Sequence, residues 1–278
     1  MNDHSGHNMK TVGKSENAAK TFRAEFTSVP RTINAGTAAN LMFTVKDTAG
    51  QIVRDLQTVH EKPMHLLVVS KDLAEFYHIH PEPQADGSYA VPHVFPNGGD
   101  YRLYADFTPP NAGQTVEPIE LKIAGTEREK TALAPDQKFE KTVDSLRVVM
   151  KPSADIKAGQ ELMLDFQAFD AATGKPATDL QNYLGELAHF VIISEDLKDF
   201  VHAHPMSKGE HDSMKNSVHN DHHSDGHAHV GGETETEKIS LSQVAAHTTF
   251  PRIGRYKIWA QFQRGGQVVT VQYVVNAA

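Results

Sequence analysis

Hydrophobic and polar positions alternate with a period of two along most of this 278-residue sequence. Because neighbouring side chains of a β-strand point to opposite faces, this alternation predicts strands that bury one face. Stretches rich in turn-forming residues, such as DTAGQ, PNGG and RGGQ, separate the runs, and no segment keeps the 3.6-residue apolar period of a capped helix. The pattern therefore predicts an all-β protein. The clearest alternating positions are Phe22, Ala24 and Phe26; Leu41, Phe43 and Val45; Tyr101, Leu103, Ala105 and Phe107; Leu146, Val148 and Met150; and Tyr256, Ile258, Ala260 and Phe262.

The chain also repeats itself. The stretch INAGTAANLMFTVKDTAGQIVRDL from Ile33 parallels IKAGQELMLDFQAFDAATGKPATDL from Ile156, and FPNGGDYRLYADF from Phe95 parallels FPRIGRYKIWAQF from Phe250. Short strands at regular spacing in a unit of about 100 residues are typical of an immunoglobulin-like (Ig-like) β-sandwich. The F-P-x-x-G-x-Y run resembles the start of an Ig-type strand that carries a tyrosine corner. We therefore predict two tandem Ig-like β-sandwich domains that arose by internal duplication.

Composition shifts suggest where these domains begin and end. Residues 1–19 contain few large apolar side chains and are predicted to be a disordered tail that carries His and Met. The first sandwich is predicted at residues 20–125, a charged, proline-bearing linker at 126–139 and the second sandwich at 140–278. A polar, His-rich insertion at residues 206–237 is predicted to be disordered.

Charge and composition argue against several functional classes. The formal net charge of −8 does not suit a nucleic-acid partner, and the longest apolar runs are too short to insert into a membrane. The absence of cysteine excludes disulfides, thiolate metal sites and cysteine nucleophiles. No nucleophile elbow, phosphate-binding loop or HExxH motif is present, so we predict that the protein is not an enzyme.

Histidine is unusually abundant, with 17 residues in the chain. Pro81 and Phe95 are separated by 14 positions, whereas Pro205 and Phe250 in the second copy are separated by 45, so the second copy has 31 extra residues. Six histidines fall among these extra residues: His211, His219, His222, His223, His227 and His229. A histidine-rich tract of this kind indicates metal binding.

A second histidine pattern occurs in both copies. MHLLVVSKDLAEFYHIHPEP from Met64 and AHFVIISEDLKDFVHAHPMS from Ala188 share His, twelve residues, His, one residue, His and Pro. If KDLA is the turn of an antiparallel hairpin, a two-residue loop sets His65 opposite His78 and a four-residue loop sets it opposite His80. His78 and His80 share a face in both cases, whereas a three-residue loop would set Ile79 opposite His65. Hairpins with even loop lengths therefore gather three imidazoles.

Three clustered imidazoles suit Cu(II), Zn(II) or Ni(II), and thioethers nearby would favour Cu(I). The alternative is that these histidines are surface residues of a duplicated structural motif, and that Met64 belongs to the core. Loop histidines before the Phe95 and Phe250 strands could add donors. The candidate metal ligands are His65, His78, His80, His189, His202 and His204, with Met64, His93, His247 and Met206 as further donors.

The stretch from Met64 and the run from Phe95 together resemble bacterial exported proteins with Ig-like YtkA-type domains, which are similar to CopC-like copper-resistance sandwiches. The resemblance covers both repeats. It implies an exported copper-binding or chaperone role, with the hairpin histidines of both copies at the matching positions.

Three functional hypotheses follow. The preferred one is a periplasmic or cell-envelope protein that binds copper, as Cu(I) or Cu(II), for buffering, resistance or delivery. Its partners would be the ion and a metal-transfer protein, and its location periplasmic or extracellular, although no export signal is visible in the sequence. The second is a zinc or nickel sequestering protein that uses the same sites. The third is a tandem Ig-like adhesion or scaffold module whose histidines are incidental.

Overall fold

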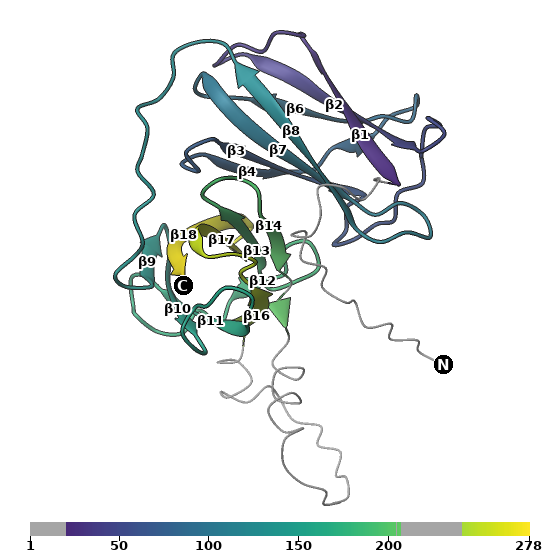
Figure 1. Cartoon of the computed structure of the whole chain (residues 1–278). Helices are drawn as coiled ribbons and strands as arrows, with labels where there is room; N and C mark the ends of the chain where they lie inside the picture. The colour runs from purple at the N-terminus through teal and green to yellow at the C-terminus, as the bar shows by residue number, and fades with distance from the viewer. Residues whose placement is uncertain (1–20, 204, 207–240) are drawn as a thin grey trace, which may run out of the picture. The chain divides into compact units, whose positions relative to one another are not determined.

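The computed structural model of the chain describes residues 21–203, 205–206 and 241–278 (Figure 1). The described residues form two compact units that divide between Leu133 and Ala134, inside the segment that the sequence indicates as a linker. The described parts of both units contain β-strands and no helix, which confirms the all-β prediction. Within these parts there is accordingly no helix long and apolar enough to cross a membrane.

The first unit is a sandwich of two antiparallel sheets. One sheet has the strand order β1-β2-β6-β5 and the other β4-β3-β7-β8. Alternate residues of the facing strands, among them Phe43, Leu66 and Leu103, form one buried core between the sheets. The strands are β1 (Phe22–Val29), β2 (Ala38–Asp47), β3 (Met64–Ser70), β4 (Phe76–Ile79), β5 (Glu82–Pro83), β6 (Tyr89–Val94), β7 (Gly99–Phe107) and β8 (Thr115–Ile123).

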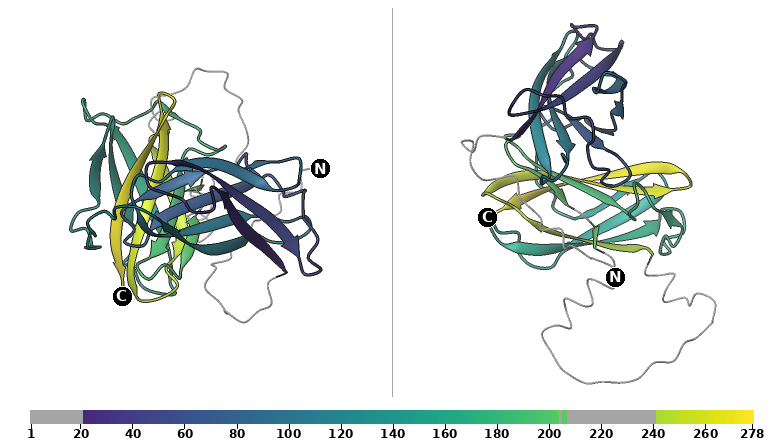
Figure 2. Two further views of the ribbon diagram at one scale, coloured as in Figure 1. Left: turned by 90° about the horizontal axis from the view of Figure 1, so that it is seen from above. Right: turned by 90° about the vertical axis from the view of Figure 1, so that its right-hand side faces the viewer.

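The second unit repeats this plan. Its sheets have the orders β15-β16-β11-β10-β9 and β12-β17-β13-β14, with β18 paired to β17. The right-hand view of Figure 2 shows the two layers, with the yellow β17 and β18 in one of them. Between the layers Phe166 stacks on Phe190, with ring centroids 4.5 Å apart. The strands are β9 (Glu140–Val143), β10 (Leu146–Pro152), β11 (Glu161–Asp170), β12 (Leu180–Gln181), β13 (His189–Ser194), β14 (Phe200–Ala203), β15 (Pro205–Met206), β16 (Gln243–Thr249), β17 (Gly254–Arg264) and β18 (Gln267–Ala277).

Both units contain the predicted tyrosine corner. The Tyr101 hydroxyl lies 3.0 Å from the carbonyl oxygen of Asn97, four residues upstream. The Tyr256 hydroxyl lies 2.9 Å from the carbonyl oxygen of Arg252, also four residues upstream. This feature and the two-sheet architecture establish that both units are Ig-like sandwiches.

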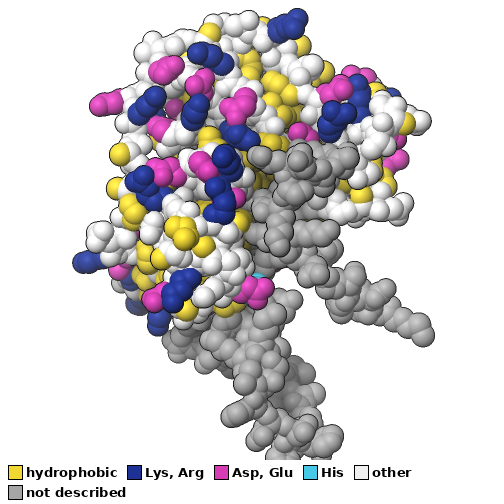
Figure 3. All heavy atoms as spheres, in the orientation of Figure 1, with side chains coloured by type: hydrophobic (Ala, Val, Ile, Leu, Met, Phe, Trp, Pro, Cys, Tyr) yellow, Lys and Arg dark blue, Asp and Glu magenta, His cyan; other side chains and the backbone are white. Residues whose placement is uncertain are grey.

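The surface drawn in Figure 3 carries charges of both signs. Lys and Arg side chains alternate there with Asp and Glu, and no large patch of one sign is visible on this face. The drawn face therefore offers no extended basic surface of the kind that binds nucleic acid.

Candidate metal centre

The hairpin β3–β4 has the register that a four-residue loop predicts. Leu66 pairs with Ile79 and Leu67 pairs with His78. One further step along this register sets His65 opposite His80, which is the second of the two pairings that the sequence left open. In the second unit Val191 pairs with His202, so the backbone of β13–β14 has the equivalent register.

A side-chain-bonded turn fixes this register. The Ser70 hydroxyl donates a hydrogen bond to Asp72 Oδ1 at 2.7 Å and accepts one from the backbone amide of Glu75 at 2.9 Å. Ser194 makes the same two bonds in the second unit, again at 2.7 and 2.9 Å. The shared Ser-x-Asp-Leu sequence therefore encodes one turn twice, and it aligns the histidines that follow.

The turn gathers three imidazoles on one face of the sheet. His65 Nδ1 lies 3.0 Å from His78 Nε2. The ring centroids of His65 and His80 are 5.0 Å apart, and those of His78 and His80 are 4.8 Å apart. One nitrogen from each ring lies within 4.8 Å of the others, and His65 is buried. The structure thus brings the three predicted hairpin histidines of the first unit together.

A backbone carbonyl selects the nitrogen of His65 that faces the cluster. His65 Nε2 lies 3.0 Å from the carbonyl oxygen of Val59, and a carbonyl can only accept, so Nε2 carries the proton. The lone pair then belongs to Nδ1, which points at His78. His189 repeats the arrangement, with Nε2 2.8 Å from the carbonyl oxygen of Tyr183, also six residues upstream. A donor imidazole held by a second hydrogen bond is the usual form of a metal-binding histidine.

A tight turn presents each of these carbonyls. Val59 and Lys62 exchange backbone hydrogen bonds of 3.0 and 3.1 Å. The two residues between them, His60 and Glu61, have φ angles of 48° and 65°. Such positive φ angles are uncommon for residues other than glycine. This turn directs the Val59 carbonyl at the imidazole of His65, so the backbone geometry fixes the orientation of the ring.

Burial lowers the pKa of His65, against the opposing effects of the Val59 hydrogen bond and the charge of Asp106. The ring is therefore neutral at physiological pH, as a metal ligand must be.

The separation of the His65 and His78 nitrogens suits a shared transition metal. Metal–nitrogen bonds of about 2.0 Å at angles of roughly 90–120° hold two ligand nitrogens about 2.8–3.5 Å apart. The 3.0 Å between His65 Nδ1 and His78 Nε2 falls in this range. The ligand nitrogens of all three histidines lie within 4.8 Å of one another, a distance that is longer than this range. A small side-chain rotation that draws the three rings together would complete the donor set.

A family model described as a domain of unknown function, DUF8832, matches residues 19–124 and again residues 141–278. The two matches together cover more than half of the chain and follow its duplication. The chain belongs to this family. No curated protein matches the sequence.

Several solved structures are similar to the DUF8832 repeats at low sequence identity. The Escherichia coli adhesin FdeC is 15% identical, with a TM-score of 0.28, over 94% of this chain and 66% of that one. A Salmonella alpha-2-macroglobulin mutant is 12% identical, with a TM-score of 0.30, over 97% and 16% of the two chains. InvD from Yersinia pseudotuberculosis is 14% identical, with a TM-score of 0.25, over 92% and 57%. The chain spans less than two thirds of the length of these structures, and the likeness assigns no function.

The second DUF8832 repeat is described only in part at its candidate site. His189 is fully buried on β13, and its Nε2 is held as in the first unit. The backbone of His202 has the expected register. The side chains of His202 and Met206 and the whole of His204 lie outside the described residues, so their role as ligands stays a prediction.

Met64 does not lie with the imidazoles. It is fully buried in the core of the first unit with Leu66 and Val68, and so it faces away from His65. Strand alternation is the reason, because adjacent residues of β3 point to opposite faces. The structure therefore assigns Met64 to the core, the alternative that the sequence also allowed.

His93 on β6 and His247 on β16 belong to the sheet that faces the β3–β4 or β13–β14 hairpin of their unit. The His93 ring packs between Tyr77 and Phe95, at centroid distances of 4.6 and 4.5 Å. His247 Nε2 lies 3.6 Å from Glu161 Oε2 instead. Within the described residues neither histidine joins the three-imidazole group. The two-sheet layout of the first unit separates His93 from its three hairpin histidines. The side chains of His202 and His204 lie outside the described residues, so the role of His247 as a ligand stays a prediction.

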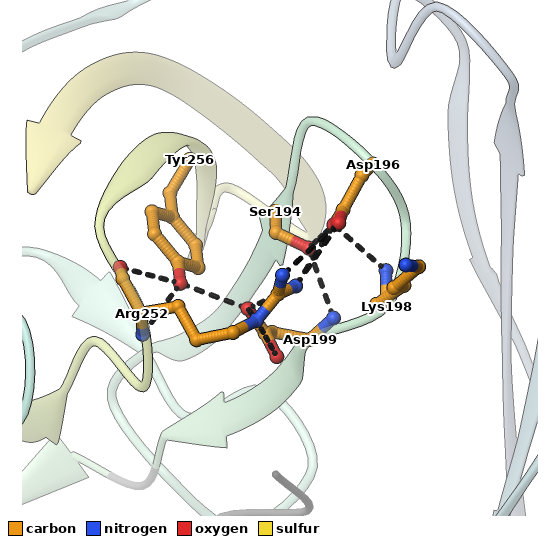
Figure 4. Close-up of polar contacts among 6 residues, drawn as sticks. All are labelled: Ser194, Asp196, Lys198, Asp199, Arg252 and Tyr256. Carbon is orange, nitrogen blue, oxygen red and sulfur yellow. Dashed lines mark hydrogen bonds and ion pairs between the residues drawn. The ribbon is translucent and has the colours of Figure 1, made fainter.

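An ion-paired network holds the far end of the second hairpin (Figure 4). Arg252 donates to Asp196 at 3.0 Å and to Asp199 at 3.0 Å, and the Tyr256 hydroxyl lies 2.8 Å from Asp199 Oδ2. Burial alone would raise the pKa of Asp196, but hydrogen bonds from Arg252 and Ser194 lower it to about 2. Sequence reasoning missed this network, although the repeated acidic residues of the two turns were a signal for it.

In the first unit, different residues hold the turn of the β3–β4 hairpin. Asp72 accepts a hydrogen bond from Arg128, and Arg128 Nε lies 3.7 Å from Glu75 Oε1. Asn97, at the position equivalent to Arg252, donates to Glu75 at 2.8 Å. Both turns are therefore anchored by an arginine, taken from the segment after β8 in the first unit and from the loop before β17 in the second.

Proposed function

We propose that this protein is an exported transition-metal-binding protein, located in the periplasm or outside the cell, that buffers or delivers copper. The observation that carries the proposal is the group of three imidazole nitrogens within 4.8 Å in the first unit. The carbonyl of Val59 adds support, because it leaves the His65 lone pair directed at the group.

Copper is favoured by the donor set and by the resemblance to copper-handling sandwiches. Imidazole nitrogen binds copper and zinc well, and Cu(II) binds a given nitrogen site more tightly than Zn(II). Assignment of Met64 to the core removes one thioether from the argument for Cu(I). Zinc or nickel sequestration on the same histidines is the competing assignment, and direct competition between Cu(I), Cu(II) and Zn(II) decides it.

Equilibrium dialysis of the full chain tests the proposal. Replacement of His65, His78 and His80 by alanine should remove about one tightly bound ion, since one cluster holds one ion. The equivalent substitutions at His189, His202 and His204 should remove about one more. The matched control is His93→Phe, which removes a histidine outside the three-imidazole group of the first unit and should leave the stoichiometry unchanged. Unchanged binding after all six hairpin substitutions would refute the proposal.

Tandem Ig-like architecture favours a second candidate, an adhesion or scaffold module. Thermal stability separates the two. A specific ion at about 100 times its dissociation constant stabilises the folded state by about 2.7 kcal/mol. Added copper or zinc should therefore raise the unfolding temperature of the wild type and not that of the six-histidine variant. Equal curves with and without metal would favour the module.

A further inference from the structure

An acidic side chain lies beside the three imidazoles in the first unit. Asp106 on β7 pairs directly with His65 on β3. Directly opposed residues on neighbouring strands share a face, with Cβ atoms about 4.5–5.5 Å apart. Asp106 is only 4% exposed, and its charge acts on the His65 ring in the direction that favours positive charge there. A cation bound by the imidazoles would experience the same field.

The carboxylate is held in place from the neighbouring loop. Gln114 Nε2 lies 2.9 Å from one carboxylate oxygen of Asp106 and 2.7 Å from the other. His60 and Lys62 act on His65 in the opposite direction, and Lys62 is itself paired with Glu82 at 2.8 Å. Asp106 is thus a fixed negative charge next to the cluster.

The second unit has an amide at this position. Gln261 on β17 pairs with His189 on β13, as Asp106 pairs with His65. Gln261 is 5% exposed, and its Nε2 donates to Thr270 Oγ1 at 3.3 Å. The duplicated sheets therefore place a neutral group where the first unit has a carboxylate.

We propose that Asp106 is a specificity-determining residue that makes the site of the first unit select divalent over monovalent ions. The inference rests on the proposed metal-binding function and adds to it which ion charge the first unit takes. The physical reason is that the Coulomb attraction of a fixed charge scales with the charge of the ion. On a logarithmic scale, a divalent ion therefore gains twice as much affinity from Asp106 as a monovalent ion at the same place.

The test is the isosteric, neutral variant Asp106→Asn in the full chain. Affinities for Zn(II) and for Cu(I) are measured against competing chelators, with the ring-nitrogen NMR signals of His78 as the site-specific readout. Removal of the charge should weaken Zn(II) about a hundredfold and Cu(I) about tenfold. Asp106→Glu, which keeps the charge, should retain most of the wild-type preference. Asp100→Asn, an exposed change on the same strand with the same effect on net charge, should alter both affinities less than about twofold.

The ratio of the two losses separates an effect of charge from a structural defect. A structural defect would weaken both ions by the same factor, so equal losses would overturn the inference, as would no loss for either ion. A wild-type protein whose His78 signals respond to neither ion would instead overturn the proposed function itself.

Discussion

His65 is oriented by the group that contacts its second ring nitrogen. The Val59 carbonyl fixes the proton of His65 on Nε2, and Nδ1 lies 3.0 Å from His78 Nε2. In the metal-free protein Nδ1 therefore accepts a hydrogen bond from His78 Nε2, and a bound ion must replace the shared proton. A hydrogen bond therefore already joins two of the three candidate ligands in the metal-free protein.

Nitrogen-15 NMR of the metal-free protein tests this tautomer. His65 should show the chemical shifts of a ring protonated at Nε2, and Zn(II) should shift Nδ1 of the same ring. The reason is that the carbonyl can only accept a hydrogen bond. A ring protonated at Nδ1 in the metal-free protein would contradict the assignment.

The buried side chain of His93 should make the stability of the protein depend on pH. Burial lowers its pKa, and its buried Nε2 has no hydrogen-bond partner among the described residues. Between the lowered folded value and the unfolded value of about 6.5, the unfolded chain binds more protons, so the free energy of unfolding decreases as the pH decreases.

The variant His93→Phe keeps a ring between Tyr77 and Phe95 and removes the titrating nitrogen. It should stabilise the protein at neutral pH by about 1 kcal/mol, because a buried polar atom without a partner is costly. Chemical denaturation between pH 5 and pH 8 should show a smaller decrease in stability than in the wild type. An unchanged pH profile together with lower stability at pH 7 would contradict this account of His93.

At the scale of elements, the turn decides where the histidines lie. The sequence predicted an antiparallel hairpin and limited its register to two even-length loops. It could not choose between them, because the choice depends on the Ser70 bonds to Asp72 and Glu75. The turn also needs Leu73 at a φ of 57°, which leucine rarely adopts, while its side chain is buried. Propensity alone would not place a leucine there.

Replacement of Arg252 tests whether the ion-paired network stabilises the turn of the second hairpin. Arg252→Ala leaves the buried carboxylate of Asp199 without its cation, and it should lower the free energy of unfolding by about 2–3 kcal/mol. Arg255→Ala is the matched control, because its partner Glu195 is exposed and such surface pairs contribute less than about 1 kcal/mol. Equal losses in urea denaturation would show that the network does not anchor the turn.

At the scale of the whole molecule, duplication made much of the fold predictable. The two-residue period, the repeated runs and the F-P-x-x-G-x-Y stretch indicated two Ig-like sandwiches, and the structure confirms them. Strand alternation decides which way two of the further candidate donors face. Met64 precedes a histidine in sequence but faces the core, and His247 lies one residue from the position equivalent to His93, so strand alternation turns it to the opposite face.

Comparison of the two repeats in sequence could not show which residues lie beside the imidazoles. Asp106 and Gln261 differ between the copies, and only the strand pairing with His65 and His189 shows that they lie beside the candidate ligands. A polar residue on a strand predicts exposure, yet both of these are buried. The difference between a carboxylate and an amide beside the two histidines therefore became visible only once the register was known.

The central claim is that one hairpin brings three imidazoles to a common ion. Anomalous diffraction at the copper and zinc absorption edges, from crystals of the metal-loaded full chain, tests it most directly. The account predicts a peak about 2.0–2.2 Å from His65 Nδ1, His78 Nε2 and a ring nitrogen of His80. A loaded protein in which these rings keep their mutual hydrogen bond, while the anomalous peaks lie elsewhere, would contradict it.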